Sequence, residues 1–307
     1  MAVYWGEKRY HSLDYYLRQT YQTKMYKISL DGGMTCPNRD GTLGHQGCIF
    51  CSAGGSGDFA ADRSLSITEQ IEQGKSQASS KYSGNSYIAY FQAYTNTYAP
   101  VPYLQKIFTE AVRHPDIRIL DIATRPDCLG EDILGLLAEL NRQKPVWVEL
   151  GLQTIHPQSA DFIRRGYELP VFEQAVRGLR AANIPVIVHT ILGLPGEDTE
   201  QMLAAVRYLN TQDIQGVKLQ LLHILKGIGL ADYYQSSPFP LPDMEEYFEI
   251  IGKCLCILRP DIVIHRLTGD GPKPLLIAPL WTGNKRRVLN RLQAYLKAHD
   301  IWQGKEF

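Results

Sequence analysis

Short apolar runs alternate along this chain with stretches of helical periodicity, and this alternation constrains the fold more than any other feature. The runs are rich in β-branched and aromatic residues, and they are separated by helical patterns of about ten to fifteen residues. Because the runs show almost no polar alternation, they predict parallel strands covered by helices, which is an α/β fold. The expected strands cover residues 26–30, 86–94, 117–124, 146–153, 185–192, 216–224 and 262–267.

Helical patterns fill most of the intervals between these strands. Asp198 followed by Gln201 three residues later is a typical helix start. Segment 227–243 lacks such a pattern, and we expect it to be a surface excursion. The expected helices lie near residues 67–80, 101–113, 130–141, 157–165, 170–182, 198–210 and 243–258.

Charge and hydropathy limit the possible surroundings of the protein. The 32 Lys and Arg residues balance 32 Asp and Glu residues, so a nucleic-acid partner would need a local basic face. The chain has no apolar run near twenty residues, and its first residues turn polar at once. We therefore expect a cytoplasmic protein without a membrane partner.

Three cysteines form a C-x11-C-x2-C array at Cys36, Cys48 and Cys51. Turn-forming residues between the first two allow the chain to fold back and bring the thiols together. In a cytosolic protein such a group more often binds a metal than forms disulfides. Three thiols are one fewer than a closed site requires, which leaves one coordination position open. The alternative is a structural zinc site with His45 as the fourth ligand.

Several motifs follow the carboxyl ends of the expected strands, where the site of a parallel βα barrel lies. The cysteine segment comes directly after the first strand, through residues 31–35. TRPDC at 124–128 follows the third strand, ELGLQT at 149–154 runs along the fourth, and ILGLPGED at 191–198 follows the fifth. We expect all four segments to meet at one mouth.

With these motifs, residues 20–265 resemble the radical S-adenosylmethionine (radical SAM) enzymes. The first cysteine gap is wider than usual, as it also is in the subgroup that contains the Elongator catalytic subunit. Segments 124–127 and 149–153 are similar to that subgroup as well, and HRLTGDGP at 265–272 resembles its stand-alone bacterial relatives. The resemblance implies a partial (β/α)6-type TIM-like barrel between an N-terminal extension, 1–19, and a C-terminal extension, 266–307.

The resemblance also implies two cofactors. The three cysteines would hold a 4Fe-4S cluster, and S-adenosylmethionine would chelate the fourth iron and yield a 5′-deoxyadenosyl radical on reduction. The usual Gly-Gly-Glu segment at the second strand is replaced by residues 93–97, so backbone carbonyls would bind the amino group. The alternative for Glu149 is an interior carboxylate paired with Arg125 or a neighbour, and for Gly193 to Gly196 it is an ordinary turn. The expected contacts of S-adenosylmethionine are Glu149, Gln153, Gly193, Gly196, Asn96 and Arg125.

The family resemblance points to the C5 side chain of the tRNA wobble uridine as substrate, with remodelling of a carboxymethylaminomethyl group. An electron donor such as flavodoxin or ferredoxin is implied. Aromatic and basic residues at 4–27, Lys27 among them, and a cationic last helix near 284–300 suit RNA binding. Both segments could instead be amphipathic helices docked on the barrel. Other possibilities are radical chemistry on a small molecule and a non-catalytic zinc or iron-sulfur module that binds RNA.

A few further residues are candidates for substrate contact or catalysis. Arg266 suits a carboxylate or phosphate, although it and His265 could simply close the last strand. Cys128 could reach the site or be a packed loop thiol. Cys254 and Cys256 lie in an apolar helical run and are expected to be buried. The candidate catalytic residues are Cys128, His265, Arg266 and Asp270, with Thr268 beside them.

Overall fold

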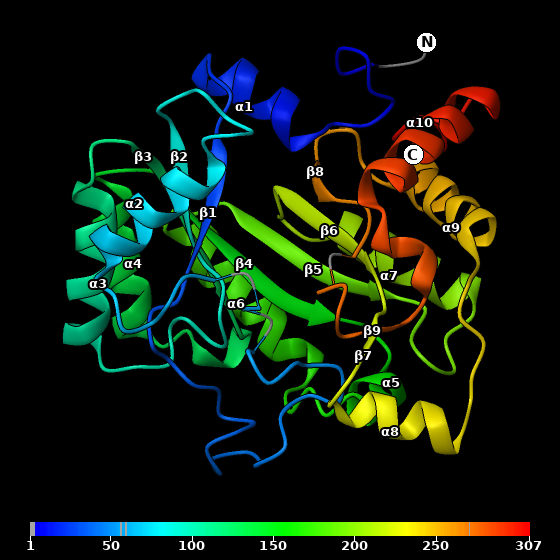
Figure 1. Ribbon diagram of the computed structural model, residues 1–307, viewed down its shortest axis with the longest axis horizontal. Coiled ribbons are helices and arrows are strands. Elements are labelled where there is room, and N and C mark those ends of the chain that lie inside the picture. The colour runs from blue at the N-terminus through cyan, green and yellow to red at the C-terminus, as the bar shows by residue number, and fades with distance from the viewer. Residues whose placement is uncertain (1–3, 56, 59, 270) are drawn as a thin grey trace.

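A seven-stranded parallel sheet, curled into a partial barrel, forms the centre of the molecule (Figure 1). The structure, a computed structural model, describes residues 4–55, 57–58, 60–269 and 271–307. The strand order β1-β2-β3-β4-β5-β6-β8 follows the chain, so β1 and β8 are the two edges. This arrangement confirms the expected α/β partial barrel and its seven strands. The strands are β1 Tyr26–Leu30, β2 Tyr87–Phe91, β3 Ile117–Thr124, β4 Val146–Gln153, β5 Val186–Leu192, β6 Gly216–Leu221 and β8 Val263–Arg266.

Helices bury the apolar side chains on the outer face of the sheet. Leu30, Phe91 and Leu120 there are fully inaccessible to solvent, and each contributes about 1.5–3 kcal/mol through burial. The expected helix start is present, since the Asp198 carboxylate accepts a hydrogen bond from the Gln201 amide at 2.9 Å. None of the described helices has the length and apolar character needed to span a membrane. Besides two α-helices that are introduced below, the described α-helices are α2 Ile67–Ala78, α3 Val101–Arg113, α4 Glu131–Asn141, α5 Pro157–Phe162, α6 Leu169–Ala181, α7 Thr199–Asn210, α9 Met244–Ile257 and α10 Lys285–Ala298.

The inner face of the sheet changes character along the strands. Near their amino ends, Ile88, Ile119, Trp147 and Ile187 form an apolar layer. Helix α1 (Leu13–Tyr21) covers this layer with Leu17, which belongs to the same buried cluster. Farther along the strands the inward positions become charged or polar. The partial barrel is therefore closed at its amino end and open at its carboxyl end.

The N-terminal segment is packed on the barrel more than the sequence suggested. Trp5 and Tyr10 are buried, and the Tyr16 ring centroid lies 6.1 Å from that of Trp147. Lys27, which we assigned to an RNA-binding surface, instead points into the sheet and pairs with interior carboxylates. That part of the prediction was wrong because Lys27 occupies an inward position of β1.

Segment 227–243 is not a simple surface excursion, because it contains helix α8 (Gly229–Ser236). Leu230 is 1% exposed, and its amide donates to the Ile49 carbonyl at 2.9 Å. The helix therefore covers the cysteine loop with its apolar side. The expected strand 216–224 is also shorter, because the chain turns after Leu221. Two short strands then pair antiparallel, β7 Ile224–Leu225 and β9 Leu276–Ala278, and the 3-10 helices are η1 Pro126–Cys128 and η2 Leu280–Gly283.

Candidate active site

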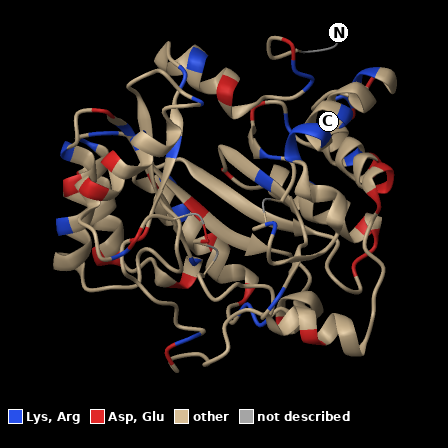
Figure 2. Cartoon of the chain, viewed as in Figure 1, with Lys and Arg blue, Asp and Glu red and all other residues tan. Residues whose placement is uncertain are grey.

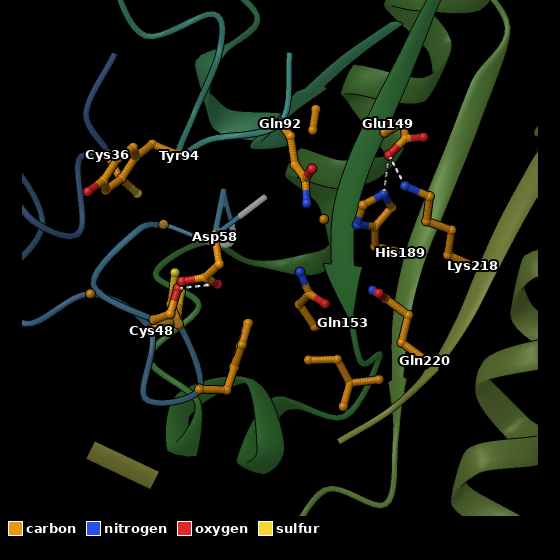
Figure 3. A pocket seen from close by; sticks show the side chains of 18 of the residues that line it. Cys36, Cys48, Asp58, Gln92, Tyr94, Glu149, Gln153, His189, Lys218 and Gln220 are labelled. Atoms are coloured by element: carbon orange, nitrogen blue, oxygen red, sulfur yellow. Dashed lines mark hydrogen bonds and ion pairs between the residues drawn. The ribbon is translucent and has the colours of Figure 1, made fainter. Parts of the chain in front are cut away.

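A cavity of about 400 Å³ lies at the open, carboxyl end of the sheet (Figure 3). Cys36, Cys48 and Cys51 all line it, and all three come from the loop between β1 and α2. Figure 3 places Cys36 and Cys48 on one side and Lys218 on the other. The topology thus brings the cysteine loop opposite the inner face of β4, β5 and β6.

Polar groups from the loop surround the cysteine thiols. The Asn38 side-chain amide donates to Sγ of Cys48 at 3.3 Å. The Arg39 guanidinium donates to the carbonyls of Cys51 at 3.2 Å and Ser52 at 2.6 Å, which holds the loop in shape. Burial raises the pKa of the Cys48 thiol to about 11, and Cys51 beside it adds to the shift. Thiolates at this position therefore require a bound cation.

The three thiols are too far apart in this structure to form a single-ion site. Among the described residues, one group of three ligand atoms lies within 4.8 Å of one another, namely Glu72, His114 and Asp116, and the thiols form no such group. Tetrahedral zinc would hold its sulfurs within about 4 Å of one another, since Zn–S bonds are about 2.3 Å. His45, the fourth ligand of the zinc alternative, is exposed to solvent, and its ring lies next to Gly41. It does not line the cavity. A cluster takes each thiolate on a different iron and needs the wider spacing.

The side of the cavity facing the cysteines carries a connected group of buried charges, which we call the interior charge cluster. The Lys27 ammonium lies 2.5 Å from Oδ2 of Asp121 and 2.9 Å from Oε1 of Glu149. Oε2 of Glu149 also accepts from Lys218. Six side chains, one from each of the strands β1 to β6, make up this cluster: Lys27, Tyr90, Asp121, Glu149, His189 and Lys218. Tyr90 donates to Glu149 at 2.7 Å, and His189 lies 2.6 Å from the same carboxylate.

Burial and mutual charge shift the pKa values within the cluster. Although burial opposes it, attraction to Lys218 and Lys27 holds the pKa of Glu149 well below its usual range. Burial, together with repulsion from Glu149, raises the pKa of Asp121 to about 7. Burial also lowers the pKa of Lys218 to about 7 despite Glu149. Burial thus favours the neutral forms of both Asp121 and Lys218.

Three of the expected S-adenosylmethionine contacts line the cavity. Glu149 lines the cavity as part of the interior charge cluster, and it pairs with Lys27 and Lys218, which fits its alternative of an interior carboxylate paired with a neighbour. Arg125 instead pairs with Asp127, with Nη2 and Oδ2 2.7 Å apart, and donates to the Arg165 carbonyl at 2.8 Å. Gln153 ends β4 with φ +67°, which turns its side chain over the cavity.

The other three expected contacts lie off the cavity wall. Asn96 is fully buried, and its amide donates to the carbonyls of Phe91 at 3.0 Å and Ala123 at 2.8 Å. It therefore ties the end of β2 to β3. Gly193 and Gly196 follow β5 with φ near +82° and +84°, which glycine adopts without strain. Neither glycine lines the cavity.

The candidate residues of the last strand have different surroundings. Arg266 lines the cavity, and its Nη1 donates to Oε1 of Gln220 at 3.0 Å. The His265 ring packs against Trp147 at 5.6 Å between centroids, and burial lowers its pKa well below the usual value. Thr268 is buried and donates to the Gly269 carbonyl at 2.7 Å. Arg266 is thus the candidate that reaches the cavity.

The remaining candidate cysteines do not join the cavity wall. Burial raises the pKa of the Cys128 thiol to about 12, and Cys128 is absent from the lining. Its surroundings match the packed-loop alternative. Cys254 and Cys256 are buried in α9, as expected of small apolar side chains. Asp270 lies outside the described residues.

Most of the interior charge cluster was missed by the sequence patterns. Lys27, Asp121, His189 and Lys218 each interrupt an otherwise apolar strand. Alternate positions such as Lys218 and Gln220 point to the same inner face of the sheet. These residues could have been predicted from the sequence, because each is a polar residue at an alternate position of a buried strand.

Comparison with known proteins gives both close and distant relatives. YtqA of Bacillus subtilis (strain 168) is 43% identical over 301 residues, which cover 98% of this chain and 94% of YtqA. The tRNA uridine(34) acetyltransferase of Methanocaldococcus jannaschii is 26% identical over 64% of this chain, which spans 36% of that protein. The solved structure of archaeal Methanocaldococcus infernus Elp3 shares the fold, with a TM-score of 0.68 at 15% identity. That alignment covers 91% of this chain and 64% of the Elp3 chain.

Two family matches cover most of the chain. Residues 41–209 match the radical SAM superfamily, and residues 214–298 match its C-terminal domain. The first match contains two of the three cavity cysteines, and the second contains Lys218 and Arg266. The cavity therefore lies between segments of both matches, and the chain belongs to the radical SAM superfamily.

Proposed function

We propose that this chain is a cytoplasmic radical SAM enzyme that remodels the carboxymethylaminomethyl group at C5 of the tRNA wobble uridine. The observation that carries the proposal is a single cavity in which three cysteines face a cationic wall. Such a cavity can hold a metal-bound cofactor on one side and an anionic side chain on the other.

Cys36, Cys48 and Cys51 would hold the 4Fe-4S cluster on which the family normally relies. When bound together, the cluster and S-adenosylmethionine supply a 5′-deoxyadenosyl radical. The chain's own contribution is to exclude water and fix the ligands, with Arg39 bracing the loop and Gln153 and Arg125 lining the cavity. A flavodoxin or ferredoxin would deliver the electron.

The proposed tRNA substrate rests on relatives and on surface charge. One relative is named as a tRNA uridine(34) acetyltransferase, and others are Elongator complex protein 3. Figure 2 shows Lys and Arg residues on α10, where Lys285, Arg286 and Arg287 form its first turn. Cationic side chains on one helix suit the phosphates of a folded RNA.

Anaerobic reconstitution followed by reduction tests the radical SAM chemistry. We expect a brown cluster and release of 5′-deoxyadenosine, whereas one colourless zinc ion per chain without cleavage would contradict the proposal. Nucleoside mass spectrometry of bulk tRNA from a deletion strain tests the substrate. Accumulated carboxymethylaminomethyluridine would support tRNA modification, and unchanged wobble uridines would point instead to a small-molecule substrate.

A further inference from the structure

Arg266 presents a guanidinium group to the cavity without an anionic partner among the residues that the structure describes. Its hydrogen bond goes to Oε1 of Gln220, a neutral amide, at 3.0 Å. A guanidinium has five N–H donors, so several of them remain for a ligand. Half-buried arginines of this kind are normally paired with a carboxylate or phosphate.

The charges around Arg266 do not balance. Lys27, Lys218 and Arg266 are three cations, whereas Asp121 and Glu149 are two carboxylates. Arg266 lies near enough to contribute to the lowered pKa values of Lys218 and His189. Burial favours the neutral forms of Asp121 and Lys218 alike, so these two pKa shifts do not remove the excess of one cation. This wall of the cavity therefore lacks an anion.

The position of Arg266 indicates where that anion would come from. Arg266 and Lys218 also line a second cavity of about 430 Å³, which is bounded by β1, β8 and the start of α10. Figure 3 shows Gln220, the partner of Arg266, across the first cavity from Cys36 and Cys48. A cofactor bound through Cys36, Cys48 and Cys51 would be held on the opposite side of the first cavity. The anion at Arg266 therefore belongs to a molecule that can reach both cavities.

We propose that Arg266 and Lys218 form a carboxylate-binding subsite for the substrate side chain, with Gln220 orienting the guanidinium. The assignment rests on the proposed function, because a carboxymethylaminomethyl group ends in a carboxylate. A uridine side chain without this carboxylate would leave the Arg266 guanidinium without an anion in a partly buried wall, whereas Lys218 would keep its ion pair with Glu149. The subsite would thus select the carboxylated side chain by about tenfold to a hundredfold, the usual range for a charge-assisted hydrogen bond.

Binding of two anticodon stem-loop RNAs tests the subsite without any turnover. One RNA carries carboxymethylaminomethyluridine and the other carries aminomethyluridine, and both are titrated into the cluster-loaded protein without S-adenosylmethionine. We expect the wild type to prefer the first by at least about tenfold and Arg266→Gln to bind both equally. Arg266→Lys keeps the charge but loses the planar fork, so it should retain part of the preference. Arg177→Gln removes an exposed arginine of α6 and should behave as wild type.

Cleavage of S-adenosylmethionine without RNA separates the two possible sources of the carboxylate. Unchanged cleavage by Arg266→Gln, with lost RNA preference, supports the substrate subsite. Equal weakening of S-adenosylmethionine binding and RNA binding would assign the carboxylate to the cofactor and overturn the proposal. A wild type without RNA preference would also overturn it. A wild type that prefers the carboxylated RNA but never modifies tRNA would contradict the proposed function alone.

Discussion

Lys27 of β1 and Glu149 of β4 form an ion pair with Nζ and Oε1 2.9 Å apart, although two strands lie between β1 and β4 in the sheet. Their side chains meet because the sheet curls and both point toward its inner face. Lys218 of β6 reaches the same carboxylate from the other direction. Glu149 therefore links three strands that share no backbone hydrogen bonds with one another.

Glu149→Gln should destabilise the fold strongly. The substitution leaves Lys27 and Lys218 buried beside a neutral amide, and loss of one partner in a buried pair costs about 3–5 kcal/mol. The free energy of unfolding from chemical denaturation measures the effect. Asp213→Asn, which removes an exposed partner of Arg180, is the matched control and should cost less than about 1 kcal/mol. Similar losses in the two variants would show that the interior cluster contributes little.

Replacement of any one cavity cysteine by alanine should abolish the cluster. Cys36→Ala, Cys48→Ala and Cys51→Ala each remove one of three thiols, and two thiols do not hold a cubane cluster stably. Iron and sulfide content after anaerobic reconstitution, with the visible spectrum, measures the loss. Cys128→Ser and Cys256→Ala should retain the cluster, because neither thiol lines the cavity. Retention of the full iron content in Cys48→Ala would contradict the assignment.

Stability should rise with pH above neutrality because of Lys218. Its pKa in the folded protein is about 7, lowered from 10.5 by burial and by the nearby Lys27 and Arg266. Between these two pH values the unfolded chain keeps a proton that the folded chain has released, so the folded state gains about 1.4 kcal/mol per pH unit. Lys218→Met removes this gain. Denaturation midpoints of both proteins at about pH 7.5 and 9.5 should therefore diverge as pH rises, and parallel midpoints would show that Lys218 stays charged.

Neutralising the first turn of α10 should flatten the salt dependence of tRNA binding. Replacement of Lys285, Arg286 and Arg287 by alanine removes up to three phosphate contacts, each worth about 0.7–0.9 in the slope of log K against log salt. Filter binding or fluorescence titration across a range of salt concentrations measures this slope. The control Lys106→Ala/Arg113→Ala removes two exposed cations of α3 and should leave the slope unchanged. An equal change in both variants would indicate nonspecific attraction.

The fold could be predicted because the sequence patterns that specify each strand and helix are local. Each βα unit carries its own periodicity, and a parallel sheet follows from the order of the units. The cysteine spacing and the motifs after β3 and β4 similarly indicated a cofactor site at the carboxyl ends. The Asp198 cap was predictable for the same reason, since all its partners lie within one turn.

The rest of the site depends on contacts that no local pattern encodes. Asn96 lies in the segment that replaces the family's Gly-Gly-Glu motif, but its side-chain amide donates to one carbonyl of β2 and one of β3. Lys27 looked like a surface cation because its carboxylate partners lie 94 and 122 residues away. The helix in 227–243 forms because Leu230 finds an apolar surface on the cysteine loop, which the helix sequence alone does not reveal.

The two edges of the sheet, β1 and β8, are not bonded to each other, so the aperture between them is set by side chains. The backbone carbonyl of His11 accepts a hydrogen bond from the Ile264 amide at 2.7 Å, and this bond anchors the N-terminal segment to β8. Across the gap, Lys27 and Arg266 come from opposite edges and flank the second cavity. No backbone hydrogen bond between the two edge strands closes this cavity, so side chains alone decide what can pass between β1 and β8.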